Sequence, residues 1–290
     1  MINYTKSHLI DFKSQLFEQN GLKVLLKPEY RNHPHASGNK WWKLKYNLEE
    51  ASRQEHDTLL TFGGAYSNHI YATAAAAREL GLKSIGIIRG EETLPLNFTL
   101  AFVKKCGMQL HYISREDYRK KSEPEFIQEL SNKFGGFYLI PEGGTNELAV
   151  KGCAEFAHQL SQEINFDYLC LPVGTGGTMA GMIEGLDQSK QIIGFPVLKG
   201  GEFLDEEIKR FTRREGNWQL MSDYHFGGYA KTTIELQQFS QQIENEFNVP
   251  LDPVYTSKMM FGVFDLVKQG FFKKGSTILV LHTGGLQGKT

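Results

Sequence analysis

The sequence of 290 residues has few cysteines and no excess of basic residues, and each absence excludes a class of protein. Its three cysteines are widely spaced and lie in apolar stretches, which excludes a disulfide framework and indicates reduced thiols. Lys and Arg together number 32, against 33 Asp and Glu, so the chain lacks the basic excess that contacts with a phosphate backbone need. Nucleic acid is therefore not expected as a partner.

Long apolar runs are also absent. A membrane-spanning helix needs about 18 or more consecutive apolar residues, and the most apolar stretch, residues 70–88, is interrupted by Arg78, Glu79 and Lys83. The first residues of the chain mix charged and apolar side chains, without the continuous apolar block of a secretory signal. We therefore expect no membrane partner and a cytoplasmic location.

What is present is the composition of a globular enzyme, with 40% hydrophobic, 12% aromatic and 22% charged residues. The length exceeds the roughly 100 to 200 residues of one typical domain, so one large or two moderate domains are expected. No Pro- or Ser-rich linker and no internal repeat marks a boundary. Two domains, if present, are therefore expected to pack closely.

The residues from about 45 to 145 alternate between helical and extended patterns. Four short apolar runs, at 58–62, 84–88, 109–113 and 137–140, are typical of strands, and helical patterns at 67–80, 96–106 and 123–133 separate them. Strands that alternate with helices at this spacing indicate βαβ crossovers and a parallel sheet. We interpret residues 45–146 as one small domain.

A second series of the same kind follows, which predicts a large domain from residues 1–44 and 147–290. Its expected helices are 148–163 and 178–185, and its expected strands are 168–173, 191–196 and 277–281. The more polar residues 199–251 predict helices and a loop. The expected fold class is therefore α/β, with two open and mostly parallel sheets flanked by helices.

A glycine-rich loop follows the expected strand 168–173 and precedes a helix. Glycine allows the backbone to approach a ligand closely, and the N-terminus of a helix offers free N–H groups and partial positive charge. The loop therefore predicts a phosphate site, although an ordinary turn between a strand and a helix is the alternative. Neither common nucleotide-binding fingerprint is matched. The loop consists of Gly174, Thr175, Gly176, Gly177 and Thr178.

A second candidate is the lysine-rich start of a helix, where Gly38 and Asn39 precede Lys40, two tryptophans and Lys43. On a helix, Lys40 and Lys43 share a face, and burial of either amine against aromatic rings would lower its pKa. A neutral amine is what a nucleophilic lysine needs. A solvated, lysine-rich surface is the alternative.

The third candidate follows the expected strand 58–62. There, two glycines precede Ser67, Asn68 and His69 at the start of a helix, which is a second N-terminus able to accept an anion, with a hydroxyl and an amide beside it. A simple helix cap is the alternative at this point.

Together these motifs are much more specific than any one of them. Gly-Asn-Lys, then Gly-Gly-x-x-Ser-Asn, the glycine loop, Asp-Pro-Val-Tyr-Thr at 252–256 and His-Thr-Gly-Gly at 282–285 closely resemble the 1-aminocyclopropane-1-carboxylate deaminase and D-cysteine desulfhydrase family. The resemblance runs from about residue 22 to the end. It implies a tryptophan synthase β-like fold (type II of the pyridoxal-phosphate enzymes), with pyridoxal 5′-phosphate in the cleft between the two domains, and commonly a homodimer.

The resemblance also implies roles for individual residues. Lys40 looks like the lysine that holds the cofactor covalently and moves the α-proton, and Asn68 like the asparagine that bonds the cofactor's 3′-oxygen. Ser67, Tyr229 and Tyr255 match residues that handle protons and contact the substrate, although core packing is the alternative for either tyrosine alone. Toward the substrate, the residues assigned in this way also include Lys43, Asn68 and His69. Toward the cofactor, they include residues 174–178, Thr256 and Thr283.

The position after Tyr255 distinguishes the two named reactions. The cyclopropane deaminases carry glutamate there, facing the pyridine nitrogen, whereas this chain has Thr256. A carboxylate would keep that nitrogen protonated and make the ring a stronger electron sink. Threonine, with Thr283 as a second neutral hydroxyl, favours α,β-elimination from a small amino acid such as D-cysteine, giving a 2-keto acid and ammonia. Deamination of 1-aminocyclopropane-1-carboxylate to 2-oxobutanoate is the alternative.

Two further readings stay open at this stage. A member of the family that binds the cofactor without turnover would need no catalytic set, yet Lys40, Ser67, Tyr229 and Tyr255 are all present. A racemase or dehydratase of the same fold would be expected to carry a Ser-x-Lys motif instead of Gly-Asn-Lys. Metal catalysis is not expected, because His33 and His35 have no carboxylate at ligand spacing.

Overall fold

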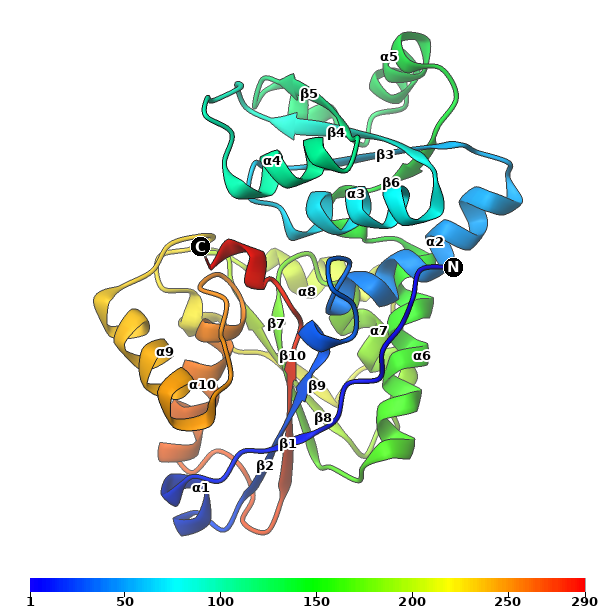
Figure 1. Cartoon of the computed structure of the whole chain (residues 1–290). Coiled ribbons are helices and arrows are strands. Elements are labelled where there is room, and N and C mark those ends of the chain that lie inside the picture. The colour runs from blue at the N-terminus through cyan, green and yellow to red at the C-terminus, as the bar shows by residue number, and fades with distance from the viewer. Residues whose placement is uncertain (290) are drawn as a thin grey trace.

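The computed structural model describes residues 1–289 and forms two open sheets (Figure 1). The larger sheet has six strands in the order β1-β2-β10-β7-β8-β9, and the smaller has four in the order β5-β4-β3-β6. The strands are β1 (Ile10–Asp11), β2 (Lys23–Pro28), β3 (Thr58–Gly63), β4 (Lys83–Arg89), β5 (Gln109–Ile113), β6 (Tyr138–Ile140), β7 (Tyr168–Val173), β8 (Gln191–Pro196), β9 (Trp218–Leu220) and β10 (Thr277–His282).

Helices cover both sheets. They are α1 (Gln15–Gln19), α2 (Asn39–Arg53), α3 (Asn68–Leu80), α4 (Phe98–Lys105), α5 (Pro124–Phe134), α6 (Glu147–Glu163), α7 (Gly177–Gly185), α8 (Phe203–Lys209), α9 (Ile234–Phe247) and α10 (Thr256–Lys268), with five short 3-10 turns, η1 (Glu29–Arg31), η2 (Asp117–Lys120), η3 (Glu142–Gly144), η4 (Ser222–His225) and η5 (Leu286–Gly288). In Figure 1, α3 and α4 cover one face of the small sheet and α5 lies on the other. Among residues 1–289, no helix is both long and apolar enough to cross a membrane.

Both sheets are parallel except at one edge. In the small sheet, β3 pairs in parallel with β4 and with β6, and in the large sheet only β1 runs antiparallel to its neighbour β2. Parallel sheets are covered on both faces, so their strands are apolar over most of their length. Leu169, Cys170 and Leu171 of β7 accordingly have no exposed surface.

The helices α2, α6 and α7 pack closely at positions where a glycine leaves no room for a side chain. A Cβ atom built on Gly152 of α6 would stand 2.0 Å from the carbonyl oxygen of Trp42 in α2, and one on Gly185 of α7 would stand 2.2 Å from the carbonyl oxygen of Ala154. The rings of Trp42 and Phe156 stack beside this contact, with centroids 4.7 Å apart. Both α2 and α7 are thereby held against α6.

The expected α/β class and its two mostly parallel sheets are confirmed. Seven of the expected strands and five of the expected helices lie within about two residues of those observed. The sequence analysis predicted no strand before residue 58, however, whereas β1 and β2 precede β3, and β2 becomes an inner strand of the large sheet. The sequence analysis also missed α10 and the strand β9, which lies within residues 199–251, where only helices and a loop were expected. The boundaries at residues 44/45 and 146/147 stay a prediction.

Candidate active site

Several candidate residues follow the carboxyl ends of three strands, one in the small sheet and two in the large sheet. β3 leads into the turn before Ser67, β7 into the loop 174–178, and β10 into Thr283. Ligands of open α/β sheets bind outside the carboxyl ends of the strands. α2 begins at the same place, since the Asn39 N–H donates to the Thr283 carbonyl oxygen (3.1 Å).

Lys40 lies in the first turn of α2 with its amine half-buried. Its Nζ donates to Oδ1 of Asn39 (3.3 Å), and Asn39 Nδ2 in turn donates to Oγ1 of Thr178 in the glycine loop (2.8 Å). Burial lowers the pKa of Lys40 to about 8. A large fraction of the amine is therefore neutral near pH 8, the condition for a nucleophilic lysine.

Lys43 is buried, with 1% of its surface exposed, and its amine is directed at the glycine loop. It donates to the carbonyl oxygen of Gly143 (2.6 Å) and to Oγ1 of Thr145 (2.8 Å), and its Nζ lies 3.5 Å from Oγ1 of Thr175. Burial and the neighbouring Lys40 hold the pKa of Lys43 well below its ordinary value. An anion bound here would offset both effects, so the geometry suits a contact with phosphate better than the substrate contact expected from the sequence.

The glycine loop fits a phosphate group. Gly176 caps α7 with a φ of +79°, a conformation that side chains disfavour. The N–H groups of Gly176, Gly177 and Thr178 have no recorded partner within residues 1–289, and the first bond of the helix runs from the Ala180 N–H to the Gly176 carbonyl. A Cβ atom on Gly177 would stand 3.3 Å from Lys43 Nζ. The free N–H groups of the loop, the hydroxyls of Thr175 and Thr178 and the amine of Lys43 therefore lie close together.

Ser67 and Asn68 begin α3 on the opposite side of this region. Oγ of Ser67 accepts the Ile70 N–H (3.3 Å), so the helix-cap alternative is correct for the acceptor side of the hydroxyl, while its proton has no recorded partner among the described residues. Oδ1 of Asn68 accepts from Nε2 of Gln287, which comes from the end of the chain. The hydroxyl proton of Ser67 and the Nδ2 of Asn68 are thus left for a ligand.

His69 is buried against a different loop. Thr61 donates its hydroxyl proton to the Ile140 carbonyl (2.8 Å), so Nε2 of His69 must donate to Oγ1 of Thr61 (2.8 Å). Nδ1 is then an unprotonated acceptor, with no partner in residues 1–289. Burial, with Lys40 and Lys43 nearby, holds the pKa of His69 well below its ordinary value. His69 therefore stays neutral, and its ring lies against Gly144.

Tyr229 and Tyr255 stand edge to face over the start of the glycine loop. Their ring centroids are 6.1 Å apart, and a Cβ atom on Gly174 would lie 3.1 Å from the Tyr255 ring. Burial raises the pKa of Tyr255 well above its ordinary value, so Tyr255 holds its proton and can act as a donor. The buried Lys258 fixes the chain before Tyr229 by donating to the Gly228 carbonyl oxygen (2.7 Å).

The two candidate threonines differ in what their hydroxyls can still do. Oγ1 of Thr256 donates to Oδ2 of Asp252 (2.6 Å) and accepts the Asp252 N–H (2.9 Å). The hydroxyl of Thr283 has no recorded partner within residues 1–289. Of the two hydroxyls, that of Thr283 is thus the one left for a ligand, whereas Thr256 orders the turn at 252–256.

Several residues of this region escaped the sequence analysis, namely Asn39, Thr145, Lys258, Asp252 and Gln287. Asn39 and Asp252 lie inside quoted motifs and were therefore detectable, while Thr145 and Gln287 lie far along the chain from the residues they contact. No group of three His, Cys, Asp or Glu side chains in the described chain is arranged to hold a metal ion.

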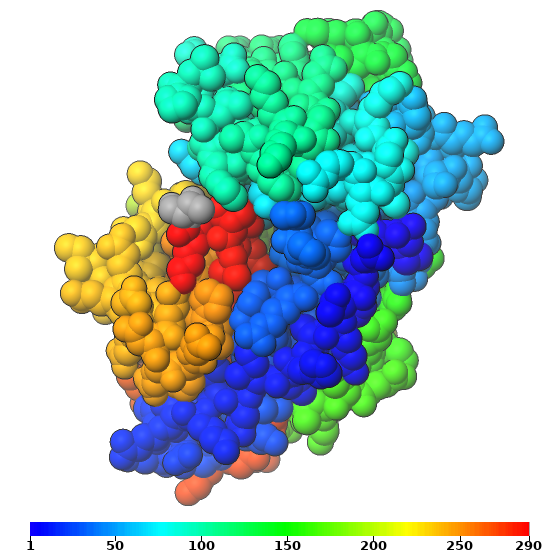
Figure 2. Space-filling model, viewed as in Figure 1, coloured from blue at the N-terminus to red at the C-terminus, as the bar shows by residue number. Residues whose placement is uncertain are grey.

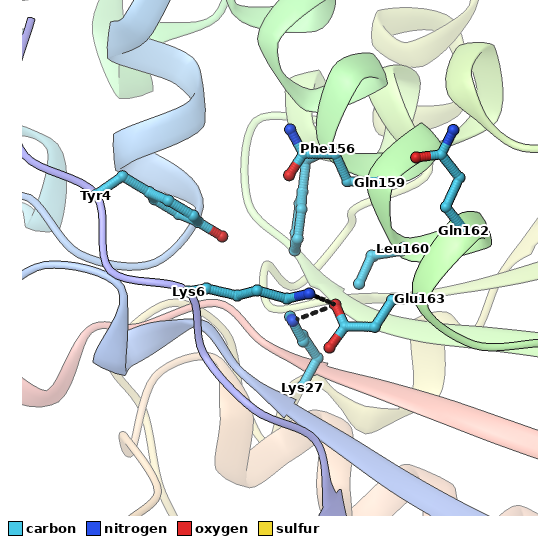
Figure 3. Close-up of a pocket in the computed structure, with 8 residues that line it drawn as sticks. All are labelled: Tyr4, Lys6, Lys27, Phe156, Gln159, Leu160, Gln162 and Glu163. Carbon is cyan, nitrogen blue, oxygen red and sulfur yellow. Dashed lines mark hydrogen bonds and ion pairs between the residues drawn. The ribbon is translucent and has the colours of Figure 1, made fainter.

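A separate cavity of about 230 Å³ lies between the N-terminal segment and α6. Figure 3 shows Lys6 and Lys27 both pointing to Glu163 at its centre. Lys27 is 2% exposed at its side chain and donates to Glu163 Oε2 (2.8 Å) and to the Ser7 carbonyl (2.7 Å). None of the predicted site residues lines this cavity, so it is not the active-site cleft.

Replacing Lys43 by methionine is expected to weaken cofactor binding without removing the covalent attachment site. A hydrogen bond to a charged group contributes about 1.5–3 kcal/mol, which corresponds to roughly a 10- to 150-fold weaker affinity. Titration of the apoprotein with pyridoxal 5′-phosphate measures this, with Lys45→Met as the matched control, since Lys45 pairs with Glu155 on the far side of the helix. An unchanged affinity together with a lost lysine-bound absorbance band would contradict the assignment.

The chain is similar to pyridoxal-phosphate dependent enzymes along most of its length. Residues 12–284 match the family model described as "Pyridoxal-phosphate dependent enzyme". A protein of Pyrococcus furiosus named putative 1-aminocyclopropane-1-carboxylate deaminase is 32% identical, over 87% of this chain and 81% of its own length. A protein of Arabidopsis thaliana named bifunctional D-cysteine desulfhydrase/1-aminocyclopropane-1-carboxylate deaminase, mitochondrial, is 30% identical, over 93% of this chain and 74% of its own.

Solved structures agree with the fold. A crystal structure of an ACC deaminase homologue superposes with a TM-score of 0.84 at 28% identity, covering 98% of this chain and 91% of that one. An O-acetylserine dependent cystathionine β-synthase from Helicobacter pylori superposes with a TM-score of 0.73 at 14% identity, over 98% and 94% of the two chains, and this likeness concerns the fold alone.

Proposed function

Because the chain belongs to the family of pyridoxal-phosphate dependent enzymes, we propose that it catalyses an α,β-elimination on a small amino acid of the D-cysteine type. The products would be a 2-keto acid, ammonia and the group lost from the β-carbon. For D-cysteine, one water is consumed, the Cβ–S bond breaks, and pyruvate, ammonia and hydrogen sulfide are formed. The deaminase and desulfhydrase names of the relatives support this reaction class.

The observation that carries the choice of elimination is that the residues expected at the ring nitrogen carry neutral side chains. Thr283 offers a hydroxyl, and Thr256 stands where a carboxylate would be needed. The carboxylate beside Thr256, Asp252, already accepts three backbone N–H groups and the Thr256 hydroxyl. When bound, pyridoxal phosphate withdraws electrons from the substrate's α-carbon. A neutral partner at the nitrogen makes that withdrawal weaker, which suffices where thiolate is the leaving group.

The other side chains of the site would bind the cofactor and the substrate and would move protons. Lys40 Nζ would hold the cofactor and, once released, take the α-proton, since its pKa of about 8 leaves a neutral fraction. The N-terminus of α3, with the Ser67 hydroxyl, would bind the substrate carboxylate. Lys43 and the loop 174–178 would hold the cofactor's phosphate. Tyr255, protonated because burial raises its pKa, would donate toward the leaving group, with Tyr229 beside it.

The second candidate is deamination of 1-aminocyclopropane-1-carboxylate to 2-oxobutanoate and ammonia. It is favoured by the names of the Pyrococcus furiosus and Thermotoga maritima relatives, both called putative 1-aminocyclopropane-1-carboxylate deaminase. The same Lys40, Ser67 and tyrosines would serve this reaction. The two candidates differ in the need for a strong electron sink, because opening the cyclopropane ring releases no ordinary leaving group.

The test is to give the purified, cofactor-loaded protein D-cysteine and 1-aminocyclopropane-1-carboxylate separately. We expect pyruvate and sulfide from D-cysteine at a rate well above that of 2-oxobutanoate from the cyclopropane. A preference for the cyclopropane would overturn the argument from Thr256 and Thr283. A protein that binds the cofactor but converts neither substrate would support a member of the family without turnover on these amino acids.

We also propose, from the resemblance and from the sequence, a homodimer in the cytoplasm with the domain boundaries given above. Sedimentation of the purified protein measures the first of these, and a monomer at working concentration would contradict it.

A further inference from the structure

Residues 283–289, near the end of the chain, contact several parts of the candidate site. We call them the C-terminal segment. At its start, the Thr283 carbonyl accepts the Asn39 N–H next to Lys40. In its middle, a Cβ atom on Gly285 would stand 2.6 Å from Nδ2 of Asn68 and 3.3 Å from Cγ of Asp252. Near its end, Lys289 forms an ion pair with Glu244 of α9.

The segment reaches from the large sheet to the unit built on the small sheet. It leaves β10, passes beneath α4 and forms the short turn η5, which contacts α4. Figures 1 and 2 show this red stretch at the junction between the upper unit and the helices α9 and α10. Its Gln287 is the residue that bonds Asn68 at the start of α3. This hydrogen bond therefore joins the two units beside the expected cofactor site.

The direction of this hydrogen bond fixes how the Asn68 amide is turned. A side-chain amide has an oxygen that accepts and a nitrogen that donates. Because Gln287 Nε2 donates to Asn68 Oδ1, the Asn68 Nδ2 points the other way. That nitrogen has no recorded partner within residues 1–289. Turned by half a rotation, Asn68 would instead offer an acceptor to the ligand.

A cofactor with an anionic 3′-oxygen needs a donor at this point. We propose that Gln287 is a positioning residue, which holds Asn68 with its Nδ2 as donor toward the 3′-oxygen of pyridoxal phosphate. This inference rests on the proposed function, because it takes the cofactor contact of Asn68 from it. Gln287 acts through Asn68 and has no contact of its own with the reacting atoms.

Changing Gln287 to glutamate is expected to reverse the Asn68 amide. A carboxylate only accepts, so it would attract Asn68 Nδ2 and leave Oδ1 facing the 3′-oxygen. Without that donor, a negative charge on the 3′-oxygen of a bound cofactor would be less well stabilised, so the proton that neutralises it would be lost only at higher pH. We expect the pH midpoint of the visible absorbance to rise by about one unit and the dissociation constant for the cofactor to rise roughly tenfold. Gln287→Met, which neither donates nor accepts strongly, should shift both in the same direction but less.

The matched control is Lys289→Met, which breaks the ion pair of the same segment with Glu244 and leaves Asn68 untouched. It should leave the pH midpoint unchanged. A double-mutant cycle separates orientation from the added charge of Gln287→Glu. In an Asn68→Ala background, Gln287→Glu should have no further effect on the midpoint, since coupled residues are not additive. An undiminished shift in that background, or no shift in the single variant, would overturn the proposal.

The proposed function fails in a different way. If the wild-type protein acquires no lysine-bound absorbance when titrated with pyridoxal 5′-phosphate, the cofactor contact of Asn68 and the inference fall together. If the wild type binds the cofactor and the Gln287 variants behave like it, only the role of Gln287 is wrong.

Discussion

Lys40→Ala is expected to abolish the visible absorbance of lysine-bound pyridoxal phosphate and to reduce turnover by at least about a thousandfold, as is typical when a covalent catalytic residue is removed. Of Lys40 and Lys43, only Lys40 has an amine whose one recorded acceptor is its neighbour Asn39. The amine of Lys43 is held by the Gly143 carbonyl and the Thr145 hydroxyl. The two lysines share one helix face and would nevertheless do different work.

The pH dependence of cofactor capture follows from the pKa of Lys40. Only the neutral amine attacks an aldehyde, and burial lowers this pKa to about 8. The rate at which wild-type apoprotein acquires absorbance should therefore rise with pH and level off above about pH 8, well below the pH at which an ordinary lysine would respond. Lys45→Ala, which removes an amine that pairs with Glu155 of α6 on another face of the same helix, should follow the wild-type curve.

A lysine-bound band that persists in Lys40→Ala would transfer the covalent role to Lys43. Circular dichroism of the variant should match that of the wild type, since the hydrogen bond recorded for the Lys40 amine within residues 1–289 goes to its neighbour Asn39. A loss of absorbance with an intact fold and measurable noncovalent cofactor binding is the expected result.

Gly152→Ala is expected to destabilise the protein by about 3 kcal/mol, which would lower Tm by roughly 5–10 °C. The added Cβ atom would stand 2.0 Å from the carbonyl oxygen of Trp42 and 3.0 Å from its carbonyl carbon. Both are backbone atoms of α2, so α6 and α2 must move apart. Because α2 carries Lys40 and Lys43, cofactor affinity should fall as well.

The control for this substitution is Gly136→Ala. A Cβ atom on Gly136 meets no atom within 4 Å, and its backbone conformation is open to other residues. Such a change leaves stability unchanged or raises it by about 0.4–1 kcal/mol, because it restricts the unfolded chain. Equal Tm values for the two variants would show that the contact between α2 and α6 relaxes without cost. Differential scanning calorimetry measures both variants.

Local patterns in the sequence determined most of the α/β framework. The apolar run 168–173 and the glycine loop after it form β7 and the start of α7 as expected, because a buried strand and a glycine-rich helix start are specified by neighbouring residues. Ser67 caps α3 for the same reason. The order of the motifs identified the family before any contact was known.

The sequence was less informative about strands whose place in a sheet depends on pairing with residues far away along the chain. β2 ends in a proline and is followed directly by the 3-10 turn η1, so its pattern alone does not distinguish an inner strand from a loop. It becomes an inner strand because β10, some 250 residues later, pairs with it from Lys23 to Pro28. The helix α10 begins with the turn ordered by Asp252, a cap that no simple periodicity reveals.

The roles of individual polar groups were decided only by the tertiary structure. The sequence placed Lys43 on the face of Lys40, but the Gly143 carbonyl and the Thr145 hydroxyl, about a hundred residues away, turn its amine to the glycine loop. Thr256 and Thr283 are both neutral hydroxyls in sequence, and only the Asp252 contact separates them. The orientation of Asn68 depends on Gln287, 219 residues further on. Backbone propensities and apolar periodicity act over a few residues and can be recognised in the sequence. A hydrogen bond between residues far apart in the chain depends on atoms that meet only after both sheets have formed.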